Sequence, residues 1–140
     1  MSWVIEIVPG DVPSDDAEAW KYLEDLREED DATLDERHLP TGKMLELYHR
    51  VTERYPCIME DPNGPWSDGP LINNFSDRLT AVGFVTSKMA EAFPFVIETA
   101  TEMGFTVFDG GDERIYRPKG WKATTAPSVA TVRPWWRFWS

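Results

Sequence analysis

The chain has 140 residues, which suits one domain, and its 25 acidic against 14 basic side chains give a formal net charge of −11. A body this negative repels phosphate backbones, which argues against direct binding of nucleic acid, and it attracts basic surfaces. The single cysteine, Cys57, excludes an intramolecular disulfide, and the lack of any apolar run of about 18 residues argues against a membrane span.

The first predicted elements are a buried strand and an acidic helix. Residues 3–8 are β-branched and aromatic apart from Glu6, which is typical of a mostly buried strand. Ser14 is a suitable N-cap for a helix. Residues 28–31 place four acids at the negative end of that helix, so we expect it to fray there into a solvated loop, or to offer these acids to something outside the domain. The apolar stripe of this helix contains Ala19, Leu23 and Leu26, with Trp20 and Tyr22 beside it.

The clearest periodicity in the chain predicts a second helix. It opens at residues 40–42 with Thr41 as the cap, and Pro56 ends it. Residues 60–70 follow, with three prolines and two glycines around Trp66, which predicts a long stiff loop of a kind that is often functional. The stripe of the helix consists of Met44, Leu47, Tyr48, Val51 and Tyr55, and it indicates core.

Two further strands, a helix and a hairpin complete the body. Residues 71–75 and 79–85 read as strands, and a third helix runs from a cap at Ser87 to Gly104, with Pro94 expected to kink or divide it. Residues 105–108 and 114–116 flank a Gly-Gly turn, which predicts a β-hairpin. We therefore expect an α+β fold, a mostly antiparallel sheet of about five strands with three helices packed on one face.

The charge distribution divides the chain into a domain over 1–117, which holds all 25 acids, and a tail over 118–140 with four bases and no acid. The tail ends in Trp-Trp-Arg-Phe-Trp-Ser. It could fold back onto the body, bind a partner, or touch a membrane interface. We favour packing against the chain itself or a neighbouring subunit, which allows a homodimer. The N-terminus lacks a basic region, so we expect no secretory signal and a cytoplasmic location.

No catalytic or metal-binding constellation emerges from the sequence. His38 and His49 have no zinc-ligand spacing, and Cys57 has no second cysteine near it, so we expect no metal, no cofactor and no enzyme activity. A Cys57–His49 pair is conceivable, but a buried inert thiol fits better. Asp109 and Asp112 resemble part of a calcium loop whose remaining ligands are missing, which favours a turn.

Two short motifs carry a family resemblance over residues 1–117. They are PWSDGPL at residues 65–71 and GFTVFD at 104–109, together with the N-terminal strand and the acidic helix. The chain resembles small acidic bacterial immunity proteins that neutralise polymorphic or type VI secreted toxins. Many members have Pro-Gln after the strand aspartate, where this chain has Gly110-Gly111. The resemblance implies a cognate basic toxin, such as a nuclease, as the partner.

The resulting hypothesis is an immunity protein whose acidic surface docks on a basic toxin. Its candidate contact residues are Trp66 as an aromatic anchor, Asp61 and Asp68 beside it, and Asp109 and Asp112 of the hairpin turn. Trp66 could instead fill the edge of its own core, and the acidity could serve only solubility. Two other functions stay open: a small enzyme or ligand-binding protein with a pocket beside residues 65–70, and a self-associating module held together by the tail.

Overall fold

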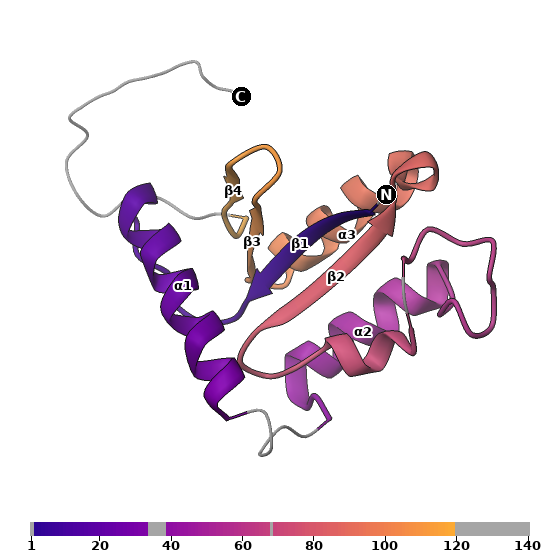
Figure 1. The fold of residues 1–140 in the computed structure, drawn as a ribbon, viewed down its shortest axis with the longest axis horizontal. Coiled ribbons are helices and arrows are strands. Elements are labelled where there is room, and N and C mark those ends of the chain that lie inside the picture. Colours follow the sequence, from indigo (N-terminus) through magenta and orange to yellow (C-terminus); the bar gives the residue numbers. More distant parts are fainter. Residues whose placement is uncertain (1, 34–38, 68, 120–140) are drawn as a thin grey trace.

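One antiparallel sheet, in the strand order β2-β1-β3-β4, forms the centre of the molecule (Figure 1). The computed structural model describes residues 2–33, 39–67 and 69–119. The elements are β1 (Ser2–Val8), α1 (Asp16–Ala32), α2 (Gly42–Arg54), η2 (Leu71–Asn74), β2 (Thr80–Val85), η3 (Thr86–Lys88), α3 (Met89–Glu102), β3 (Thr106–Asp109) and β4 (Arg114–Tyr116). The predicted α+β class and antiparallel sheet are confirmed, with four strands in place of about five.

The strand β1 has a neighbouring strand on each side, and it carries buried side chains on both of its faces. Ile5 and Ile7 point into the larger core cluster, which α2 and α3 complete with Leu47, Val51, Val96 and Ala100. Val8 points the other way, into a smaller cluster with Phe108 and with Ala19 and Leu23 of α1. Successive side chains of a strand alternate between the faces of a sheet, so the two clusters lie on opposite faces.

The position of α1 therefore differs from the expectation that all three helices cover one face. α2 and α3 share one face, and α1 covers part of the other, apart from them in Figure 1. The physical reason is that Val8 and Phe108 are apolar on the face opposite Ile5 and Ile7, and a single helical layer would leave them exposed to water. α1 covers only one end of this face, and Val4 at the other end is 50% exposed.

The segment predicted as a strand over residues 71–75 is a 3-10 helix, η2. Its backbone hydrogen bonds join residues three apart, from the Asn73 amide to the Pro70 carbonyl (3.1 Å) and from the Phe75 amide to the Ile72 carbonyl (3.1 Å), which is the pattern of a 3-10 helix and not of a strand. Trp66, and not residues 71–75, pairs with β2, through an isolated antiparallel bridge to Phe84. Two backbone hydrogen bonds hold this bridge, from the Ser67 amide to the Gly83 carbonyl (2.9 Å) and from the Val85 amide to the Pro65 carbonyl (2.7 Å).

The other predicted elements are present with small shifts. The first strand, the second helix, β2 and the β3–β4 hairpin lie where the sequence placed them. α1 begins after Asp15, which caps it in place of Ser14 by accepting from the Glu18 amide at 3.0 Å. α3 is one helix with Pro94 inside it, so the division into two pieces does not occur. It ends before Gly104, whose φ of +95° favours glycine.

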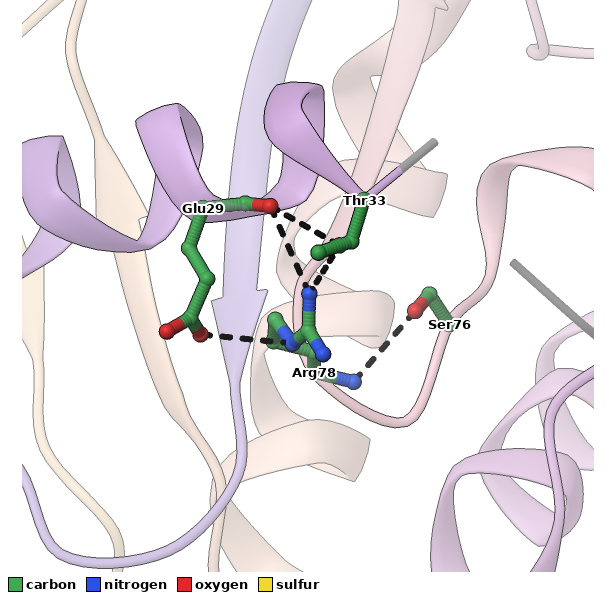
Figure 2. Close-up of polar contacts among 4 residues, drawn as sticks. All are labelled: Glu29, Thr33, Ser76 and Arg78. Atoms are coloured by element: carbon green, nitrogen blue, oxygen red, sulfur yellow. Dashed lines mark hydrogen bonds and ion pairs between the residues drawn. The ribbon is translucent and has the colours of Figure 1, made fainter. Parts of the chain in front are cut away.

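The acidic end of α1 stays helical to Ala32, which corrects the expectation that it frays at residues 28–31. Arg78, from the turn before β2, supplies the positive charge that this helix end lacks (Figure 2). Its guanidinium donates to the Glu29 carbonyl (3.5 Å) and to the Thr33 hydroxyl, and it lies 3.4 Å from the Glu29 carboxylate. A cation at a helix C-terminus offsets the partial negative charge of its free carbonyl groups.

We expect Arg78→Ala to lower the free energy of unfolding by about 1 kcal/mol, because the last turn of α1 loses its cation. Hydrogen exchange of the amides at residues 29–33 should accelerate, and urea denaturation should give the free energy. Arg50→Ala is the matched control, since Arg50 forms an exposed pair with Glu46 inside α2 and should cost no more than about 0.5 kcal/mol. Equal effects of the two variants, with unchanged exchange at 29–33, would contradict this role of Arg78.

Candidate functional site

Trp66, the expected aromatic anchor, lies in the core. Its side chain is 1% exposed and packs against Phe84 with 5.4 Å between ring centroids. The indole N–H donates to the Tyr55 carbonyl at 2.7 Å, which satisfies its one polar atom. This geometry matches the alternative interpretation, in which Trp66 fills the edge of its own core. A buried indole has no surface with which to contact a partner.

The two aspartates chosen beside Trp66 do not form a contact surface around it. Asp61 is half-buried and shapes its own loop, because its carboxylate accepts from the Asn63 amide (3.2 Å) and its carbonyl accepts from the Gly64 amide (3.1 Å). Such a turn is a structural use of an aspartate side chain. Asp68 lies outside the described residues.

The hairpin aspartates have different environments. Asp109 is fully buried, and one of its carboxylate oxygens accepts from the Trp3 indole N–H (2.9 Å), the Gly111 amide (3.1 Å) and the Asp112 amide (3.3 Å). This carboxylate organises the turn and ties it to β1, so it is unavailable as a docking charge. Asp112 is exposed. The predicted turn at this position is therefore present, with Asp109 as its structural centre.

The Asp109 carboxylate also affects its surroundings. Its second oxygen is buried without a hydrogen-bond partner among the described residues. Burial raises the pKa of the nearby Tyr116 above its usual value; Arg114 opposes that shift, and the negative charge of Asp109 adds to it. The five predicted contact residues thus divide into two buried side chains, one turn former, one exposed acid and one residue that lies outside the described part.

The strongest negative surface lies on α1, which the candidate residues did not include. Its 17 residues hold eight acids and two bases, and seven of the eight acids are exposed. One of the two bases, Arg27, is bound by Glu6 of β1, at 2.8 Å for Nε and through a second contact from Nη2. The hydrogen bond that Arg27 donates to the Glu6 carboxylate is the main cause that raises the pKa of Arg27 above its usual value. The exposed side of α1 is therefore dominated by carboxylates.

A groove of about 610 Å³ lies between α1 and the β3–β4 turn, and we call it the α1 groove. Its lining combines an aromatic ring, a glycine and four charged side chains. Trp20 is half-buried, with its ring 5.2 Å from that of Phe108 in an edge-on contact. Glu24 and Glu113 have no ion-pair partner in the described part of the chain. The residues that line the groove are Asp16, Trp20, Glu24, Arg27, Gly110 and Glu113.

The thiol and the described histidine lie in different environments. Cys57 is buried, as expected, and its sulfur accepts from the Leu71 amide at 3.1 Å. His49 is exposed on α2, and its ring packs beside Tyr48. His38 lies outside the described residues. Within 2–33, 39–67 and 69–119, no three His, Cys, Asp or Glu side chains are grouped as metal ligands.

The sequence contained a signal for the α1 surface that we did not use. Acids fill nearly half of residues 16–32, a density found nowhere else in the chain. The sequence places Trp20 beside the apolar stripe, and the structure has it half-buried against the smaller core cluster. The groove itself was not predictable, because Gly110 and Glu113 come from a hairpin far along the chain.

Comparison with protein-family models, with curated protein sequences and with solved structures finds no match to this chain. No helix in the described ranges is both long and apolar enough to cross a membrane.

Replacing Trp66 with alanine is expected to destabilise the domain by about 3–5 kcal/mol, since it empties a large site in the core. Met59→Ala, in the same region but with Met59 69% exposed, should change stability by less than about 0.5 kcal/mol. Guanidinium denaturation followed by far-UV circular dichroism measures both. A Trp66→Ala protein as stable as the parent would show that the indole does not support the core.

The two turn glycines should respond differently to alanine. A Cβ at Gly111 would lie 2.4 Å from the Trp3 ring, whereas a Cβ at Gly110 meets nothing within 4 Å. We expect Gly111→Ala to cost about 1–3 kcal/mol through displacement of the indole, and Gly110→Ala to cost little. Urea denaturation gives the energies, and the NMR resonance of the Trp3 indole N–H reports the loss of its bond to Asp109. Similar behaviour of both variants would rule out this packing contact.

Proposed function

We propose that this chain is an immunity protein that binds a basic toxin through the exposed acids of α1 and the adjoining α1 groove. The supporting observation is the concentration of eight acids on one helix next to a half-buried tryptophan. A negative surface beside an aromatic side chain is the combination that fast, tight binding of a basic protein requires. Trp20 takes the role of anchor that Trp66, being buried, cannot fill.

The charges of α1 suit long-range attraction. Only two bases accompany eight acids in the helix, which gives it a net charge of −6. A field of one sign over one face speeds the encounter with an oppositely charged surface and orients it. The effect weakens as salt rises, because the Debye length falls to about 8 Å at physiological ionic strength.

The nature of the partner rests on the family resemblance. The resemblance to immunity proteins suggests a secreted antibacterial toxin, and a nuclease fits best because its active site must be basic to hold phosphates. An acidic helix can occupy such a surface and block access of the nucleic acid. We place this inhibition in the cytoplasm of the producing cell and assign the chain no catalysis of its own.

The alternative of an enzyme or a ligand-binding protein with a pocket beside residues 65–70 gains no support. Pro65 and Trp66 are buried against β2. The α1 groove, which does have the volume for a bound side chain or peptide, lies beside α1 and the hairpin turn.

Neutralising the outer acids of α1 should weaken the complex. The test variant carries Glu18→Gln, Glu24→Gln, Asp25→Asn and Glu28→Gln. The immunity proposal predicts a secreted toxin encoded beside this chain's gene, and that protein is the partner in the test. We expect nanomolar binding of the parent, and a loss of affinity on the order of tenfold or more for the variant, mainly through slower association. Biolayer interferometry at two salt concentrations measures it.

The matched control removes four exposed charges elsewhere, with Glu53→Gln, Glu60→Gln, Glu91→Gln and Glu102→Gln. The control removes as many negative charges as the test variant does. An affinity of the control within about twofold of the parent therefore locates the effect on α1. Equal losses in both variants would mean that only overall charge matters. Death of toxin-producing cells that also make abundant parent protein would end the immunity proposal.

A further inference from the structure

We propose that the C-terminal segment of this same chain, residues 120–140, binds in the α1 groove of its own domain and covers it. The proposal rests on the charge and lining of the groove, on the place where the described chain ends, and on the composition of the segment. It does not depend on the identity of any external partner.

The α1 groove favours an occupant that is both cationic and aromatic. Glu24 and Glu113 face it from α1 and from the hairpin turn, and neither has an ion-pair partner among the described residues. Trp20 contributes a half-buried aromatic ring to the same lining, and the base of the lining, Arg27, is already bound by Glu6. A guanidinium or ammonium group over an indole face, with carboxylates nearby, gains from both cation–π attraction and charge.

The chain approaches the groove shortly before the described residues end. Arg117 donates to the carbonyls of Pro13 (2.7 Å) and Ser14 (3.2 Å) and to the carboxylate of Asp16 (2.9 Å), a residue of the groove lining. Two residues later, the Lys119 amide donates to the Thr101 carbonyl at 3.0 Å. The remaining 21 residues can span at most roughly 70 Å when extended, which is ample for a return to the groove.

The composition of the segment matches that of the groove. Residues 120–140 contain three bases and no acid. Their aromatic side chains gather near the end, so that cations and rings alternate as Arg133, Trp135, Trp136, Arg137, Phe138 and Trp139. Tryptophan and arginine are the side chains that contribute most to binding at protein surfaces.

Tethering favours the chain's own groove over the groove of a second copy. Because the segment belongs to the same chain, its effective concentration at this groove is on the order of millimolar wherever the linking residues can span the distance. Another groove in the described part of the chain, about 350 Å³, suits a basic segment less well, because two acids and Lys43 line it, whereas three acids, Arg27 and Trp20 line the α1 groove. The segment therefore shields the acidic surface near α1 and, where the proposed toxin uses the same surface, must be displaced by it.

The test uses the full chain without a partner. Arg137→Lys keeps the charge and supplies an amine near the chain end, and a carbodiimide joins amines directly to neighbouring carboxylates. Mass spectrometry of the monomeric fraction should find the amine at position 137 joined mainly to Glu24 or Glu113, and the yield should fall as sodium chloride is added. Links confined to a dimeric fraction, or links from position 137 spread evenly over the acids of α1, α2 and α3, would overturn the proposal.

A second variant fills the groove. Gly110 lines it, has an ordinary φ, and leaves open space for a side chain, so Gly110→Arg adds a cation without strain. In the Arg137→Lys background it should reduce the link to Glu24 and Glu113 by roughly tenfold, because like charges repel. Ala90→Arg adds the same charge on an exposed site of α3 and should leave the link unchanged. Equal yields in the two variants would refute docking in this groove, while a thermal melt confirms that both remain folded.

Discussion

The burial of β1 on both faces is the constraint on which the rest of the molecule depends. Ile5 and Ile7 require cover on one face, where α2 and α3 lie, and Val8 requires cover on the other, where α1 lies. One amphipathic layer could not serve both. Because α1 is the helix on this face in the described part of the chain and covers only part of it, a long side of this helix remains in solvent and carries its acids outward.

An acidic helix of this kind needs support from other parts of the chain. Glu6 of β1 holds Arg27, Arg78 from the turn before β2 reaches the last turn, and Arg117 after β4 binds at the first turn. These contacts fix both ends and the middle of α1 against the sheet. The three arginines are engaged in these structural contacts. The exposed acids of α1 therefore dominate the electrostatic potential of this face.

The same packing produces the α1 groove. The β3–β4 turn, held by the buried Asp109 carboxylate, places Gly110 and Glu113 opposite Trp20 and Glu24. A groove with an aromatic ring and carboxylates can recognise a cation more selectively than an open charged surface, because the ring excludes water from part of the contact. A basic partner and the basic segment of the chain itself are both suited to it, which links the proposed inhibition with a means of shielding the surface until a partner is present.

The sequence by itself determined the local elements and the charge. A β-branched and aromatic run predicted the first strand, helical periodicity predicted the second helix, and alternation around a Gly-Gly turn predicted the hairpin, because these signals depend on neighbouring residues. Only the tertiary structure decided the placement of α1, the helical form of η2 and the burial of Trp66. Each of these depends on contacts between distant segments, such as Arg78 with Glu29 and Trp66 with Phe84. A tryptophan in a proline-rich loop has the same local sequence whether it fills a core or faces solvent, and long-range packing alone distinguishes the two.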